Sequence, residues 1–101
     1  MTDAQRVRRS ADYILSAGLR KGESLDDGID IVANGDPADV FDALFGHGLT
    51  TSHTQALSAF AARYFGIEDV FFRLDEWNDE KETTAEDVAA LLRAWADELE
   101  K

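Results

Sequence analysis

The feature that most constrains the fold is a pair of apolar segments with helical spacing between residues 36 and 72. The first repeats apolar residues at steps of three and four, at Val40, Phe41, Leu44 and Phe45. The second does the same at Leu57, Phe60, Ala61, Tyr64 and Phe65. Each segment is followed by a glycine, Gly46 or Gly66, and glycine commonly occupies the left-handed position after a helix. This stretch therefore predicts two short helices, with a further turn near Val70.

Helix-start signals extend the same reading to the rest of the chain. Thr2 with Gln5 predicts a capping box for a first helix, and Ser24 is the expected cap of a second. Asp36 followed by Pro37 predicts the start of a third helix, because proline suits the first helical position. Thr50, Thr51 and Ser52 are candidate caps for the fourth, and Thr83 or Thr84 for the last.

The second segment leaves two interpretations open. Leu25, Ile29 and Val32 are spaced for one helical face, whereas Ile29, Ile31 and Val32 are also β-branched and would suit a strand. We favour a helix because no partner strand is evident nearby. Gly28 inside it predicts close approach of a neighbouring helix, since glycine costs about 1 kcal/mol relative to alanine there.

Together these signals predict an all-α fold, a compact bundle of five or six short helices plus a C-terminal amphipathic helix. We expect a helical domain over residues 1–77, a charged linker over 78–83 and the last helix over 84–101. That helix has a heptad-like stripe at Val88, Leu92, Trp95 and Leu99. The stripe either packs on its own domain or supplies the contacts of a homodimer.

Charge is unevenly distributed along the chain. The net charge is −11, yet residues 1–21 carry +3 from five basic and two acidic side chains, so the remainder carries −14. No lysine or arginine occurs between Gly22 and Ala62. A surface that binds nucleic-acid phosphates needs clustered Lys and Arg, which this span lacks. The acidity serves either solubility alone or an acidic surface that contacts a partner.

Several functional classes find no support in the residues. The chain has no cysteine, and His47 and His53 are its only histidines, at a spacing that fits no common metal motif. Residues 75–86 have the length of a calcium loop but carry Glu80 where the glycine is needed. We therefore expect neither an enzyme nor a cofactor. Without a signal peptide or an apolar span of membrane length, we expect a cytoplasmic protein.

One segment resembles a known family. The sequence ALSAFAARYFGIEDVFF, residues 56–72, is similar to the fourth helix and following turn of lambda-repressor-like (XRE-type) helix-turn-helix domains, especially those of actinobacterial regulators. The order of short helices and the position of Gly35 agree with that family. The resemblance covers roughly residues 3–74, and it implies a regulator of transcription whose third helix would read DNA.

The predicted reading helix carries the wrong charge for DNA. Its exposed positions would be Asp36, Ala38, Asp39, Asp42 and Ala43, and carboxylates there would be repelled by phosphate. We therefore expect Asp36, Asp39 and Asp42 to face a protein partner, such as a regulator with a basic surface. The alternative is a dimeric DNA-binding repressor, in which the cations at the start of the chain would contact phosphates: Arg6, Arg8, Arg9, Arg20 and Lys21.

Overall fold

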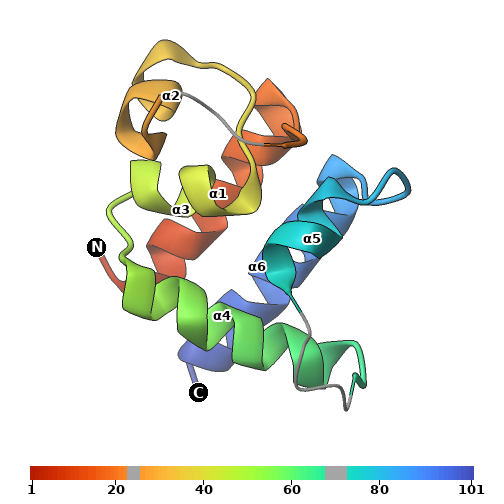
Figure 1. The fold of residues 1–101 in the computed structure, drawn as a ribbon. Helices are drawn as coiled ribbons and strands as arrows, with labels where there is room; N and C mark the ends of the chain where they lie inside the picture. Colours follow the sequence, from red (N-terminus) through yellow and green to blue (C-terminus); the bar gives the residue numbers. More distant parts are fainter. Residues whose placement is uncertain (23–25, 68–72) are drawn as a thin grey trace.

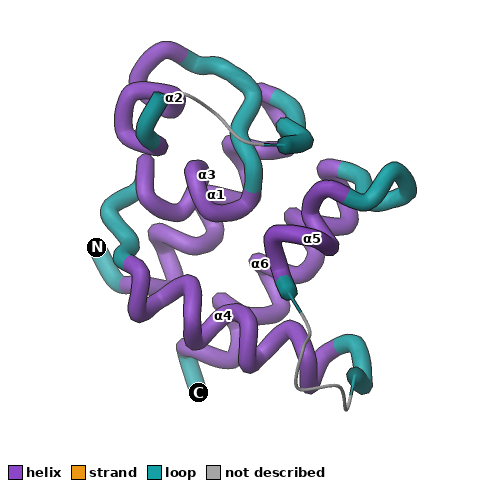
Figure 2. Tube along the Cα trace, viewed as in Figure 1, coloured by secondary structure: helices purple, strands orange, loops and turns teal. Residues whose placement is uncertain are grey.

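The computed structural model describes residues 1–22, 26–67 and 73–101, and these residues form six helices without a strand (Figures 1 and 2). The all-α prediction is confirmed. Helices α1 (Asp3–Ala17) and α6 (Ala85–Leu99) lie side by side and antiparallel, and they form the most extensive helix contact in the molecule. Helices α2 (Gly28–Asn34) and α3 (Val40–Gly46) pack together at one end, while α4 (Thr51–Tyr64) crosses the other end. The short α5 (Leu74–Asp79) leads into α6.

Helix α1 begins as its sequence predicts. Thr2 and Gln5 form both bonds of the capping box, and Gly18 follows the helix with a φ of 105°. Val7, Ala11 and Ile14 are fully buried along one face, as their spacing indicates. Leu15, next to Ile14, lies off this buried face, and its side chain is 39% exposed.

Helix α6 is part of the same folded unit as α1. Thr84 and Asp87 form its capping box, and its buried residues join those of α1 and α3 in one hydrophobic core. The charged linker predicted over residues 78–83 is therefore wrong. Asn78 belongs to α5 and is buried, and Thr83 is buried with its hydroxyl donating to the Trp77 carbonyl at 2.7 Å. A run of polar residues here makes a tight turn between two packed helices.

The 28–34 segment is a helix, but it starts later than predicted. Its N-cap is Asp27, whose carboxylate accepts from the Asp30 N–H at 2.9 Å. The predicted cap, Ser24, lies outside the described residues, as do Leu25 and the turn expected near Val70. The predicted close approach at Gly28 is confirmed, because a Cβ there would lie 2.5 Å from the Asp42 carbonyl oxygen.

Helix α3 also starts later, at Val40 rather than at Pro37. The preceding residues are extended and pair with the segment after α1. Arg20 N–H donates to the Ala38 carbonyl at 3.0 Å, and Ala38 N–H donates to the Gly18 carbonyl at 3.2 Å. This pairing buries Ala38 completely. Pro37 therefore does not start the helix, because residues around it pair instead with a backbone segment about twenty residues earlier in the chain.

Helix α4 follows its expected bounds closely. It begins after Thr50, one of the three candidate caps, and the Thr50 N–H donates to His53 Nδ1 at 3.0 Å. Leu57 and Ala61 are fully buried, while Tyr64 and Phe65 are exposed near the end of the helix. Over the described ranges, no helix has the length and apolar character needed to cross a membrane.

Candidate functional site

The three carboxylates predicted to face a partner occupy different environments. Asp36 is exposed, whereas Asp39 and Asp42 are half-buried. Asp39 is the N-cap of α3, and its side chain accepts from the Asp42 N–H at 2.7 Å. The expected exposure of Ala38 and Ala43 is wrong, since both are fully buried. Every residue of α3 is buried or half-buried, so this helix projects little toward solvent.

Burial dominates the electrostatics of Asp39. It raises the pKa of that carboxyl to about 6, and the neighbouring Asp42 and Asp79 add to the increase. The backbone N–H groups of Asp42 and Phe41 oppose it by donating to the ionised form. The pKa of Asp42 is also raised by burial, against the attraction of the nearby Arg20. Perturbed carboxyls of this kind mark a place to look for function.

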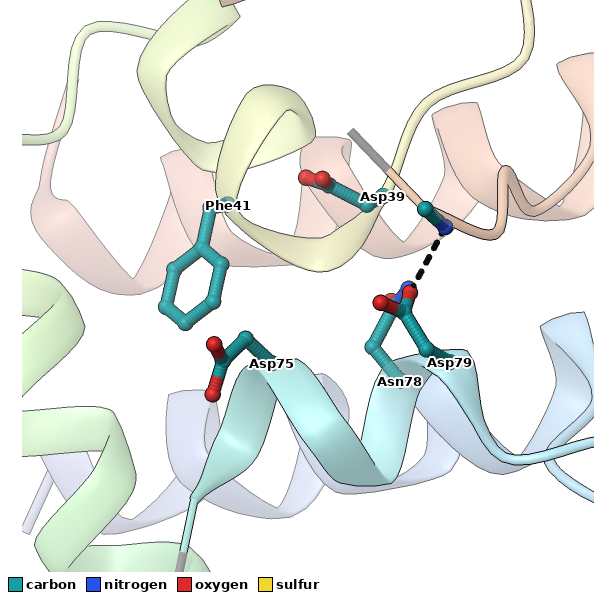
Figure 3. A pocket seen from close by; sticks show the side chains of 6 residues that line it. Asp39, Phe41, Asp75, Asn78 and Asp79 are labelled. Carbon is teal, nitrogen blue, oxygen red and sulfur yellow. Dashed lines mark hydrogen bonds between the residues drawn. The ribbon is translucent and has the colours of Figure 1, made fainter. Parts of the chain in front are cut away.

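Asp39 borders a cavity of about 270 Å³ between α3, α5 and the backbone at Gly22 (Figure 3). Phe41 comes from α3 and lies over Asp75 of α5, and Asp79 stands one turn further along α5. The lining is thus one aromatic ring, three carboxylates and the Asn78 amide. Such a lining favours a positively charged or hydrogen-bond-donating group.

Asn78 connects the walls of this cavity. Its Oδ1 accepts from the Val40 N–H at 3.0 Å, and its Nδ2 donates to the Arg20 carbonyl at 3.0 Å. Next to it, Asp79 Oδ1 accepts from the Gly22 N–H at 2.9 Å, the bond drawn in Figure 3. Sequence reasoning missed this site by placing Asn78 in a linker. The available signal was that Asn78 lies four residues after Leu74, on the buried face of α5.

Three of the five candidate phosphate-binding cations, Arg6, Arg8 and Lys21, are bonded within the fold. Arg8 pairs with Asp97 and Glu100 of α6, and Arg6 donates to the His47 carbonyl at 3.4 Å. Lys21 donates to three carbonyls around the end of α5, those of Asn78, Glu80 and Thr83, at 2.6–2.7 Å. Arg20 lies near Asp42. Arg9 is exposed and forms no ion pair with the described residues.

The residues proposed as dimer contacts are mostly internal. Val88 and Leu92 are fully buried and Trp95 is only 3% exposed, in the core that α6 shares with α1. Packing on its own domain is therefore the correct interpretation of this stripe, and these three side chains are not available to a second subunit. Only Leu99, at 40% exposure, reaches the surface.

Helix α2 presents the most exposed aliphatic side chain of the described helices. Ile29 is 65% exposed, and Ala33 follows one turn later and is also exposed. The exposed charged side chains of residues 26–36 are all acidic: Asp26, Asp27, Asp30 and Asp36. We call this surface, from Asp26 to Asp36, the α2 face. The α2 face thus combines exposed apolar side chains, Ile29 and Ala33, with acidic side chains.

The two histidines serve the ends of helices. His47 Nδ1 donates to the Ala43 carbonyl at 2.7 Å, and His53 Nε2 contacts Asp3 at 3.0 Å across the starts of α1 and α4. In the described part of the chain, no group of three or more His, Cys, Asp or Glu side chains could hold a metal ion.

Comparison with known proteins identifies one family. The model of a family of unknown function, DUF6197, matches residues 1–98. Neither the curated proteins nor the solved structures contain a match to the chain.

Proposed function

The chain belongs to the family of unknown function DUF6197, and we propose from its own geometry that it is a protein-contact module that binds a basic protein. The observation that carries this proposal is the α2 face. An exposed isoleucine surrounded by carboxylates offers apolar contact at its centre and charge complementarity at its rim, the arrangement expected of a polar-rimmed interface.

The absence of lysine and arginine from the α2 face supports a basic partner. The sequence has no lysine or arginine from Gly22 to Ala62, which includes the whole α2 face. An acidic surface of this kind attracts basic partners over distances of about one Debye length, roughly 8 Å at physiological salt. The partner is therefore a protein with clustered Lys or Arg around an apolar depression.

We propose that this contact takes part in the regulation of transcription, because residues 56–72 resemble lambda-repressor-like domains. The order of short helices supports the proposal, with α2 and α3 consecutive and joined through residues 35–39. Many regulators carry basic surfaces that contact DNA. A module that covers such a surface would compete with DNA for it.

The DNA-binding alternative draws less support from the same geometry. A reading helix must project polar side chains into the major groove, and α3 has no exposed residue. Three of the cations that would contact phosphate, Arg6, Arg8 and Lys21, are bonded inside the fold.

Site-specific photo-crosslinking in the native host tests the proposal. A benzoylphenylalanine replaces Ile29 on the α2 face, and the matched control replaces Leu15, an exposed leucine of α1 outside that face. We expect position 29 to capture a basic protein and position 15 not to capture it. Changing Asp30 and Asp36 to lysine should abolish the capture. Equal capture from both positions, or capture of nucleic acid from position 29, would reject the proposal.

A further inference from the structure

The turn that ends α2 contains an asparagine followed by a glycine. Asn34 is the last residue of the helix, and Gly35 follows it in the left-handed conformation, with a φ of 74°. Both residues are exposed, and the Asn34 side-chain amide forms no hydrogen bond with the residues that the structure describes. The only other asparagine of the chain, Asn78, is buried, precedes an aspartate and is hydrogen-bonded through both side-chain polar atoms. The two asparagines therefore differ in exposure, in hydrogen bonding and in the residue that follows.

An exposed asparagine before a glycine can lose its side-chain amide without an enzyme. The backbone nitrogen of Gly35, after it releases its proton, attacks the Asn34 Cγ, and the side-chain nitrogen leaves as ammonia. The product is a five-membered succinimide ring. Water then breaks one of the two ring C–N bonds, which leaves aspartate or isoaspartate at position 34. Glycine favours the attack because it has no Cβ to hinder the approach of its nitrogen.

The folded turn opposes this reaction. The Gly35 N–H donates to the Val32 carbonyl at 3.1 Å, and the Asp36 N–H donates to the Ile31 carbonyl at 3.1 Å, which together form a Schellman motif. The attacking nitrogen is thus hydrogen-bonded, and Asn34 is part of the helix. The attack requires the nitrogen to be released and the backbone of Asn34 to rotate toward its own side chain. The reaction therefore proceeds from an open form of the turn.

The turn is also held from α1, by the Tyr13 hydroxyl. That hydroxyl donates to the Asp36 carbonyl at 2.5 Å and lies 3.1 Å from the Ile31 carbonyl oxygen, so it contacts both ends of the Schellman motif. The Tyr13 ring is half-buried and packs edge-on against His47. Helix α2 has only seven residues, too few to be stable without tertiary contacts. Tyr13 is therefore placed to control how often this turn opens.

We propose that Asn34 is a site of spontaneous deamidation, and that the hydrogen bond from Tyr13 limits the rate of this reaction in the folded protein. Each event replaces a neutral amide by a carboxylate, so the α2 face gains a further negative charge. Asn34 lies outside the hydrophobic core, and the reaction therefore changes the charge of this surface without removing a core contact.

Peptide mapping by mass spectrometry measures the reaction at each asparagine. The folded protein and the protein unfolded in urea are incubated at neutral pH, and the deamidated fraction is followed with time. We expect Asn34 to react in both samples, but about tenfold or more slowly in the folded one, because only the open turn reacts. Asn78 should stay intact in the folded protein. Equal rates at Asn34 in both samples, or an Asn34 that reacts only in urea, would reject the proposal.

Two tyrosine variants test the role of the Tyr13 contact. Tyr13→Phe keeps the ring and removes the hydroxyl, so Asn34 should react about threefold to tenfold faster in the folded protein, the change expected for loss of one hydrogen bond. Its rate in urea should equal that of the wild type. Tyr64→Phe is the matched control, because Tyr64 is exposed in α4, at the other end of the molecule (Figure 1).

The comparison of these variants has a definite negative result. The control of the rate by Tyr13 is rejected if folded Tyr13→Phe reacts at the wild-type rate, or if both variants are accelerated equally. No partner enters this experiment, so its outcome is independent of the proposed function.

Discussion

The α1–α6 pair and the α2–α3 pair are built on opposite principles. The first buries a continuous apolar stripe from each helix and balances its surface charges across the interface, with Arg8 facing Asp97 and Glu100, and Arg93 bonded to Asp12 at 2.9 Å. The second is held by close backbone approach, and its surface charges are all negative. The difference is that the α1–α6 half balances its surface charges internally, while the α2–α3 half keeps surface charge of one sign, the feature on which the proposed partner contact rests.

The largest effect should come from removing Trp95, which is almost fully buried in the α1–α6 half. Trp95→Ala should lower the free energy of unfolding by about 3–5 kcal/mol, because truncating a buried aromatic side chain loses its burial and leaves a cavity. Urea unfolding measures the loss. Sedimentation of the wild type checks the same point, since a dimer mediated by this residue would contradict its burial within one chain.

The α2–α3 half should instead be sensitive to added volume. A Cβ at Gly46 would lie 2.2 Å from Val32 Cγ2 and 2.6 Å from the Gly28 carbonyl oxygen. We expect Gly46→Ala to cost about 2–3 kcal/mol, as overpacking does in other cores. The control is Gly66→Ala, because no atom lies within 4 Å of a Cβ built at Gly66. Only the positive φ of 68° disfavours alanine there, and we expect it to cost about 1 kcal/mol of unfolding free energy. Equal costs at the two glycines would show that α2 and α3 are not in close contact.

Lys21 ties the segment after α1 to the turn between α5 and α6, because its ammonium donates to three carbonyls there. Lys21→Met keeps the aliphatic stem and removes the donors, so it should lower the free energy of unfolding by about 1.5–2 kcal/mol. Lys81→Met is the matched control, since Lys81 is exposed on the same turn and forms no ion pair with the described residues. Thermal unfolding should give a lower midpoint temperature for Lys21→Met than for Lys81→Met. Equal midpoint temperatures would argue against a stabilising role for the three Lys21 hydrogen bonds.

The smallest effect on stability should come from the α2 face. Ile29→Ser removes an aliphatic side chain that is mostly exposed, and it should change the free energy of unfolding by less than about 0.5 kcal/mol. Its effect should appear only in binding, as loss of the crosslinked partner. A strong loss of stability in this variant would mean that Ile29 belongs to the core rather than to a contact surface.

The sequence predicted the elements that depend on local signals. The capping boxes at Thr2 and Thr84 and the apolar stripes of α1, α4 and α6 follow from spacing alone, because caps and helix faces involve residues a few positions apart. The class of fold followed from the same patterns.

What the sequence could not predict depends on partners far along the chain. Ala38 is extended because it pairs with the segment 18–20, and Asn78 is buried because it bonds Val40 and Arg20. Arg8 looked available to phosphate because its acceptors, Asp97 and Glu100, lie about ninety residues away at the end of α6. No local pattern encodes such pairings, so the cavity and the engaged cations emerged only from the three-dimensional arrangement.

The central claim is that Arg6, Arg8 and Lys21 are bonded within the fold rather than available to phosphate, and that the α2 face contacts a basic protein. A gel-shift titration with a nonspecific DNA duplex at about 50 mM salt tests it most directly, because the sequence-independent attraction to phosphate is strong at low salt. The account predicts no shift at micromolar protein. A shift that weakens steeply as salt is raised toward 200 mM would contradict it, since that dependence requires several phosphates to be neutralised by lysine and arginine.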